Sequence, residues 1–171
     1  PRFMSEKTMT GAQIGTAFHR AMCMIDLNAL RSAASLEAAI AGEMARLLAL
    51  GVLTEAEYNA VPARMLVSFF ASPVGQRLLH SDCVKREWAF TYRRVTQDGQ
   101  VQLVQGVIDC CFMENGKWVL LDYKTDRDAQ GAIERHRGQL DIYADALCTI
   151  TGVPVSGRVL YLVRMGVGYS I

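Results

Sequence analysis

Asp109, Asp122 and Lys124 are charged residues that do not suit the apolar strands of the stretch GVIDCCFMENGKWVLLDYKTD, at positions 106–126. Because side chains at positions i and i+2 of a strand share a face, Asp122 and Lys124 should point the same way. Asn115-Gly116 is typical of a two-residue hairpin turn, so the flanking strands should fold back and bring Asp109 towards Asp122. The sequence therefore predicts two carboxylates beside one amine.

Both aspartates follow runs of apolar residues that predict buried strands. Taken singly, an acidic residue in a strand is most often a solvated edge position. An unpaired buried carboxylate, however, costs on the order of several kcal/mol, which favours paired or metal-bound carboxylates. Their hard oxygen ligands favour Mg²⁺ or Mn²⁺.

An ion held by two aspartates can activate a water molecule and bind a phosphoryl oxygen. The ammonium group of Lys124 could stabilise the charge that develops during attack, which gives Asp109, Asp122 and Lys124 catalytic roles. The alternative is that Lys124 is only the salt-bridge partner of the aspartates. The first interpretation predicts a phosphodiester hydrolase.

Composition indicates a single globular domain, because 171 residues with 51% hydrophobic and 20% charged residues can form a substantial core. There is no run of ~18 apolar residues for a membrane span and no signal-peptide pattern, so we expect a cytoplasmic protein. The five cysteines suit reduced thiols. The net charge of +1 leaves nucleic-acid binding to local basic clusters. Because the chain starts without methionine, we expect it to be a fragment of a longer polypeptide.

The elements that must position these residues follow from capping and periodicity. Helices are expected at 11–25 and 35–50 and after Thr54, Pro62 and Pro73. Strands are expected at 84–95 and 100–113, on the far side of the turn at 115–116, and at 155–163. A helix is expected at 132–151, ended by Gly152. The pattern is that of one α/β domain.

Asp109, followed thirteen positions later by Asp122-Tyr123-Lys124, resembles the PD-(D/E)XK nuclease motif in its DYK variant. GTAFH at 15–19 is similar to the Gly-x-x-x-His element of the RecB-like branch, and QLDIY at 139–143 is similar to its Gln-x-x-x-Tyr element. Four further segments resemble the C-terminal nuclease domain of the AddA family of helicase-nuclease subunits: PRFM at 1–4, IDL at 25–27, KREWAF at 85–90 and DYKTD at 122–126. The resemblance covers essentially the whole chain.

The resemblance implies a restriction-endonuclease-like α/β fold with a central mixed sheet flanked by helices and an N-terminal helical segment. Residues 1–171 would form a single RecB-like nuclease domain, with the nuclease core at 82–171. The helical segment at 30–80 would either cover the sheet or line a tunnel for DNA.

The resemblance also implies a ligand set in which His19 joins Asp109 and Asp122 at the metal, with the backbone carbonyl of Tyr123 as a further oxygen. Without the resemblance, a histidine on an apolar helix would be interpreted as a core residue. Glu87 stays open between an ion pair with a neighbouring arginine and a position near the site.

Gln139 and Tyr143 are four residues apart and should share one helix face. The resemblance implies that Gln139 lies near Lys124 or the DNA backbone and that Tyr143 steadies or stacks on the strand, although Tyr143 could also be core packing. A basic cluster beside them would supply counter-charge to phosphates: Arg127, Arg135 and Arg137. Little sequence preference is expected.

The resulting hypothesis is a Mg²⁺- or Mn²⁺-dependent DNA exonuclease acting on single strands fed by an attached helicase in double-strand-break repair, with an AddB-like second subunit. The resemblance implies that the 3′-ended strand is trimmed. ATP would be used only by the helicase, because the chain lacks a GxxxxGK[ST] loop, and the cysteine spacing argues against an iron-sulfur cluster. The alternatives are a catalytically silent DNA-binding or subunit-docking module and a free-standing RecB-like nuclease of phage or CRISPR type.

Overall fold

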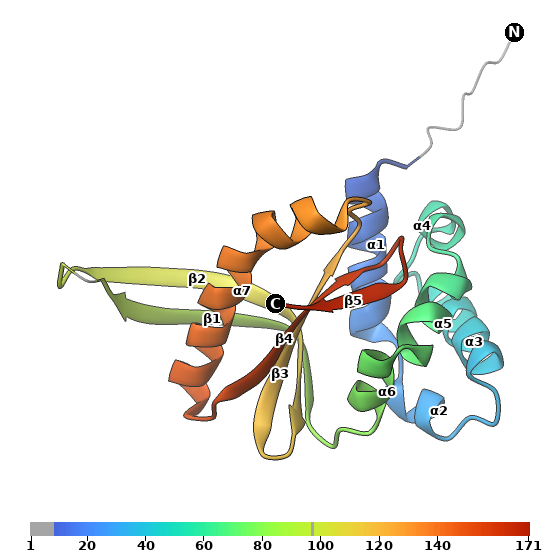
Figure 1. Ribbon diagram of the computed structural model, residues 1–171. Coiled ribbons are helices and arrows are strands. Elements are labelled where there is room, and N and C mark those ends of the chain that lie inside the picture. Colours follow the sequence, from blue (N-terminus) through green and yellow to red (C-terminus); the bar gives the residue numbers. More distant parts are fainter. Residues whose placement is uncertain (1–8, 97) are drawn as a thin grey trace, which may run out of the picture.

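The computed structural model describes residues 9–96 and 98–171, and the PRFM segment at 1–4 lies outside them. Within these residues five strands form one sheet and seven helices pack around it (Figure 1). The strands are β1 (Val84–Val95), β2 (Val101–Glu114), β3 (Lys117–Lys124), β4 (Val155–Leu162) and β5 (Val167–Ser170). The helices are α1 (Gly11–Met24), α2 (Leu27–Arg31), α3 (Leu36–Ala49), α4 (Glu55–Ala60), α5 (Ala63–Ala71), α6 (Pro73–Leu79) and α7 (Ala129–Thr151).

The sheet is mixed, with its strands in sequence order. β1, β2 and β3 form an antiparallel meander, β4 runs parallel to β3 after the crossover through α7, and β5 returns antiparallel to β4. Asn115 and Gly116 have φ values of 51° and 73°, as a type I′ hairpin requires. This mixed sheet with helices on both faces confirms the predicted fold class.

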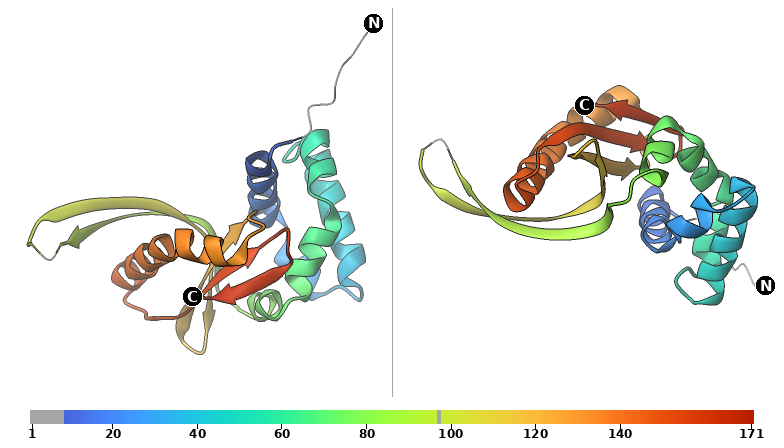
Figure 2. Two further views of the ribbon diagram at one scale, coloured as in Figure 1. Left: turned by 45° about the horizontal axis from the view of Figure 1, so that its top comes forward. Right: turned by 90° about the horizontal axis from the view of Figure 1, so that it is seen from below.

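Each face of the sheet has its own hydrophobic core. The first core joins α1, α3 and α5 to one face and contains the buried rings of Phe18, Phe69 and Tyr161. The second core joins α7 to the other face through Leu140 and Leu147. Figure 2 shows this separation, with α7 on one side and the helical layer from α1 to α6 on the other. The central part of the sheet is therefore covered on both faces, whereas Val95, Val101 and Leu103 at the far end of the β1–β2 hairpin are exposed.

Capping residues determine where the helices start and stop. Thr10 with Gln13 and Thr54 with Glu57 form the two predicted capping boxes, at α1 and α4. Gly51 follows α3 with φ of 69°, a left-handed conformation that glycine adopts without steric cost. These helix boundaries confirm the sequence prediction.

Three elements differ from the prediction. α7 begins at Ala129 rather than 132, because the Asp128 carboxylate accepts a hydrogen bond from the Gly131 N–H and caps the helix earlier. α2, with five residues, and β5, with four, were not predicted because they are too short to show a periodic pattern. The predicted helical character of 30–80 is confirmed, whereas its role beside DNA stays a prediction. No helix among the described residues is long and apolar enough to cross a membrane.

Candidate functional site

At Glu87 and Asp109, the side chains of the β1–β2 hairpin stop alternating regularly between the two faces of the sheet. Cys110 packs in the first core and Ile108 in the second, although residues two apart in a regular strand share a face. Glu87, at the same level of β1, has a φ of 47°, which is rare for a residue with a side chain. The ladder keeps one register on both sides of this level. The irregularity therefore turns both Glu87 and Asp109 towards α1.

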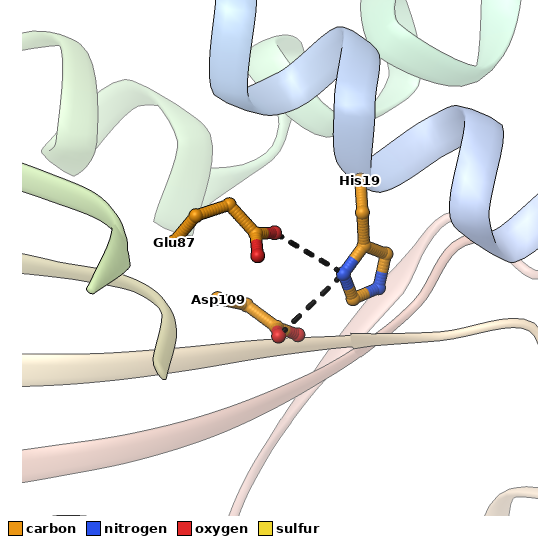
Figure 3. Close-up of side chains that lie close together, drawn as sticks. All are labelled: His19, Glu87 and Asp109. Carbon is orange, nitrogen blue, oxygen red and sulfur yellow. Dashed lines mark ion pairs between the residues drawn. The ribbon is translucent and has the colours of Figure 1, made fainter. Parts of the chain in front are cut away.

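His19, on α1, faces these two carboxylates (Figure 3). Its Nδ1 lies 3.5 Å from Glu87 Oε1 and 3.5 Å from Asp109 Oδ1. Its Nε2 lies 3.1 Å from the Tyr123 carbonyl oxygen, which can only accept, so Nε2 carries the proton that is donated. In the neutral ring Nδ1 then presents a lone pair to the carboxylates. Ligand atoms of His19, Glu87 and Asp109 all lie within 4.8 Å of one another.

Asp109 is the most perturbed carboxyl group of the site. Its Oδ2 accepts a hydrogen bond of 2.8 Å from the Tyr123 N–H. Burial raises the pKa of Asp109 to about 7, and the nearby Asp122 carboxylate acts in the same direction, whereas His19, the Tyr123 N–H and Lys124 oppose the rise. A group buried in this way is stabilised as an anion by an additional cation.

Asp122 and Lys124 form an ion pair behind this cluster. Lys124 Nζ lies 2.7 Å from Asp122 Oδ2, and the Asp122 side chain is 1% exposed. Both Asp122 oxygens are buried, and Oδ1 has no polar partner within the described residues. The β2–β3 ladder ends at Cys110 and Leu121, one residue before Asp109 and Asp122 would face each other. The Asp122 carboxylate does not belong to the cluster formed by His19, Glu87 and Asp109.

The Tyr123 ring is a packing residue of the hydrophobic core. It is buried in the first core, and it packs edge-on against Phe18 at 5.5 Å, Phe69 at 5.4 Å and His19 at 5.7 Å between centroids. Burial raises the pKa of Tyr123 well above 10, so the phenol stays neutral. Only the backbone of Tyr123, through its N–H and carbonyl, belongs to the site.

A pocket of about 590 Å³ opens beside these groups, and its lining includes His19, Glu87, Lys124 and Asp126. α1 approaches the loop after β3 closely here, since a Cβ at Gly15 would lie 3.4 Å from Thr125 Cγ2. The first turns of α1 thus lie in van der Waals range of this loop, and His19 follows one turn later beside the end of β3. The pocket has room for an ion and a phosphoryl group.

The predicted DNA-binding pair lies on α7, over the second core. Gln139 and Tyr143 share a helix face as expected, and Gln139 Nε2 donates a hydrogen bond of 2.7 Å to the Tyr143 hydroxyl. The Tyr143 ring packs edge-on against Phe90, with centroids 5.5 Å apart. The pair is half-buried. It therefore has a packing role, and its binding to DNA stays a prediction.

The three predicted arginines have different environments. Arg135 forms an ion pair of 2.6 Å with Asp126, whereas Arg137 is exposed and lacks an acidic partner within the described residues. Arg127 is also exposed and lines a different pocket, together with Arg64. The arginines do not form one cluster.

The donor set fits a hard divalent cation. Two carboxylates and the imidazole Nδ1 converge from α1, β1 and β2, whereas the Tyr123 carbonyl, expected as a further ligand, lies at Nε2 on the other side of the His19 ring. Apart from the Lys124 ammonium at Oδ2, the buried Asp122 oxygens have no hydrogen-bond donor within the described residues, which leaves Oδ1 able to bind a cation. His19, Glu87, Asp109 and Asp122 could surround such an ion.

Sequence reasoning missed part of this site. Asp126 lines the pocket and holds Arg135 and His136, a role that its position in the DYKTD segment could have indicated. For Glu87 the sequence left two interpretations open, an ion pair with an arginine and a position near the site. Its approach to His19 depends on its left-handed backbone, which no local sequence pattern shows.

Comparison with known proteins gives a consistent result. A family profile described as the PD-(D/E)XK nuclease superfamily matches residues 2–167. Relatives include an ATP-dependent helicase/nuclease subunit of Lysinibacillus sphaericus, at 39% identity over 95% of this chain, and that of Pelotomaculum thermopropionicum, at 38% identity over 97%. The protein of the same name from Bacillus pumilus is 33% identical over 100% of this chain. This chain spans 14%, 14% and 15% of these relatives.

Proposed function

This chain belongs to the PD-(D/E)XK nuclease superfamily, and from that membership we propose that it is the nuclease domain of an AddA-type helicase-nuclease. It hydrolyses phosphodiester bonds of single-stranded DNA as an exonuclease in double-strand-break repair. The observation that carries the proposal is the convergence of His19, Glu87 and Asp109 beside the pocket that Lys124 lines.

Asp109, Asp122 and His19 would hold a Mg²⁺ or Mn²⁺ ion, and the Tyr123 carbonyl orients the His19 ring that binds it. The Nδ1 lone pair of His19 and the Asp122 Oδ1 atom, which has no partner within the described residues, support this ligand set. Glu87 Oε1, at 3.5 Å from His19 Nδ1, adds a carboxylate on the solvent side of the pocket. The ion would activate a water molecule and neutralise charge on the phosphoryl oxygens.

The protein groups around the ion orient the reactants. The Asp122 carboxylate holds the Lys124 ammonium at the pocket, where it donates hydrogen bonds to the attacking water or to oxygens that gain charge. The Tyr123 carbonyl fixes the His19 ring, so that the imidazole keeps the tautomer with Nδ1 free. Gln139 and Tyr143, with Arg127, Arg135 and Arg137, position the DNA backbone.

The larger assembly follows from the relatives, whose name includes a helicase activity. A helicase portion of the same polypeptide delivers the strand and uses the ATP, and an AddB-like protein is its partner. The exonuclease digests single strands with little sequence preference in the cytoplasm.

End-labelled linear single-stranded DNA tests the proposal directly. With Mg²⁺ or Mn²⁺ the chain is expected to shorten the strand, to stop when EDTA is added, and to spare a circular single strand. Asp122→Asn and Lys124→Gln are each expected to lower the rate about a hundredfold or more, because each removes preorganised charge at the reacting phosphate.

Lys117→Gln is the matched control, because Lys117 is an exposed lysine at the other end of β3. It is expected to retain the wild-type rate. If Lys124→Gln cuts as fast as Lys117→Gln, Lys124 has no catalytic role. If a folded wild-type chain binds single strands without cutting them in either metal, the catalytically silent binding module is the correct alternative.

A further inference from the structure

A second pocket, of about 420 Å³, lies on the other side of the first turns of α1. It is an open pocket lined by the starts of α1 and α5, the end of α4 and the segments that follow β3 and β4. Three arginines contribute to its lining: Arg64, Arg127 and Arg164. Ile14 and Met65 form an apolar part of the lining. The pocket therefore combines positive charge with a surface that a sugar or base could contact.

These arginines have no carboxylate partner among residues 9–96 and 98–171. Other arginines nearby are paired, as in the ion pairs Arg20–Glu57 and Arg135–Asp126. The Nε atom of Arg164 is buried and donates no hydrogen bond within the described part of the chain. Several guanidinium groups around one cavity repel each other unless an anion lies between them.

The N-terminus of α5 adds a second, independent feature that favours an anion. Its N-cap residue is Pro62, and no side chain accepts a hydrogen bond from the first turn. The other six helices have a side-chain cap. Free N–H groups and the positive end of the helix dipole bind phosphate oxygens at such termini. Pro62 and Arg64 both line the pocket.

The position of the pocket identifies the source of the phosphate. Sequence neighbours line the two pockets: Asp126 and Val163 line the one at the metal centre, whereas Arg127 and Arg164 line the second. We propose that the second pocket binds a backbone phosphate of the DNA strand whose scissile phosphate lies at the metal centre. This inference rests on the proposed function, and it assigns Arg64 and Arg164 to strand binding.

Fluorescence anisotropy with labelled oligothymidylates in EDTA tests this site without cleavage. The Arg64→Gln/Arg164→Gln double variant is expected to bind single strands at least about tenfold more weakly, because it loses hydrogen bonds between charged groups. Its plot of log affinity against log salt should be shallower by about 0.7 for each phosphate that the variant no longer binds. Arg93→Gln, which removes an exposed arginine of β1 that lines neither pocket, should bind as the wild type does.

Two further measurements show which ligand the pocket binds and whether the double variant still has its metal site. Inorganic phosphate should compete only weakly, because a strand is bound at additional positions, and Mn²⁺ should bind the double variant as it binds the wild type. Equal DNA affinity and salt slope in the double variant and in Arg93→Gln would overturn the inference and leave an acidic polypeptide as the occupant. Binding of free phosphate as tight as that of the strand would also overturn it. Because EDTA prevents cleavage, failure of the nuclease assay alone does not affect this test.

Discussion

At the scale of single residues, the site depends on a histidine that is oriented by the protein backbone. The Tyr123 carbonyl accepts from His19 Nε2, so the opposite nitrogen faces Glu87 and Asp109. Without a cation, a lone pair and two carboxylates would face each other at close range. The arrangement is therefore suited to a bound cation, and it makes the protonation of Asp109 measurable.

The first prediction concerns the stability of the metal-free chain. The pKa of Asp109 is raised from 3.8 to about 7, so between these pH values the folded state holds a proton that the unfolded state has released. The contribution of Asp109 to stability, measured as the difference between the wild type and Asp109→Asn, should therefore fall as pH rises from about 4 to about 7, by at most about 4 kcal/mol in total. Urea unfolding in EDTA across this range measures the difference.

Asp109→Asn should remove this contribution, because the amide oxygen can still accept from the Tyr123 N–H but no longer titrates. Asp145→Asn, an exposed change on α7, should keep it. A difference between the wild type and Asp109→Asn that does not change over this range would contradict the assignment.

The second prediction separates strain from function at Glu87. With φ of 47°, this position suits glycine, so Glu87→Gly is expected to raise the free energy of unfolding by about 1 kcal/mol. The same change should weaken Mn²⁺ binding, because one carboxylate is removed from the cluster. Glu87→Gln, which keeps the strain, should weaken Mn²⁺ binding without this gain in stability.

Denaturant unfolding and Mn²⁺ calorimetry on the two variants provide the test. Mn²⁺ affinity equal to that of the wild type in both would show that Glu87 is not part of the metal site.

Asp109, Asp122 and Lys124 could be predicted from the sequence because a strand and a hairpin are local patterns. The sequence left Glu87 open because a positive φ in mid-strand depends on packing against α1.

At the scale of elements, caps and turns explain why most boundaries were predictable. Thr10, Thr54 and Asn115 act on backbone groups within three residues, so their effect is present in the sequence. α2 and β5, with five and four residues, are too short to show a periodic pattern, and a window of this size does not reveal their packing partners. The same limit applies to α7, whose faces are predictable but whose neighbours are not.

The third prediction concerns α7. Tyr143→Phe retains the ring that packs on Phe90 and removes the hydroxyl that accepts from Gln139, so it should cost about 1 kcal/mol of stability. Gln139→Ala should have a similarly small effect on stability but weaken single-strand binding several-fold. Thermal unfolding and anisotropy measure the two quantities. If Gln139→Ala binds DNA as the wild type does, the pair is only structural.

At the scale of the whole molecule, the two cores have different relations to the site. The first core contains the Tyr123 ring, so its packing holds the carbonyl that orients His19. The second core lies under α7 and supports the proposed strand-binding face. Neither relation was predictable from the sequence, because the partners are far apart along the chain.

The fourth prediction follows from this difference. Phe69→Ala should cost about 3–5 kcal/mol and also weaken Mn²⁺ binding, because Phe69 packs edge-on against Tyr123. Leu147→Ala, in the second core, should cost about 2–5 kcal/mol with unchanged Mn²⁺ affinity. Titration calorimetry below the unfolding temperature of each variant measures the two Mn²⁺ affinities. Equal losses of Mn²⁺ affinity would contradict a specific role for the first core.

The most direct measurement for the metal centre is thermal unfolding during Mn²⁺ titration of the wild type, Asp109→Asn and Asp145→Asn. Binding to the folded state alone should stabilise the wild type and Asp145→Asn progressively, by about 2.7 kcal/mol at a hundred times the dissociation constant. Asp109→Asn should gain little, because it lacks a charged ligand. A wild type whose unfolding temperature does not respond to Mn²⁺, or an equal response in Asp109→Asn, would contradict a cation site built from His19 and its neighbouring carboxylates.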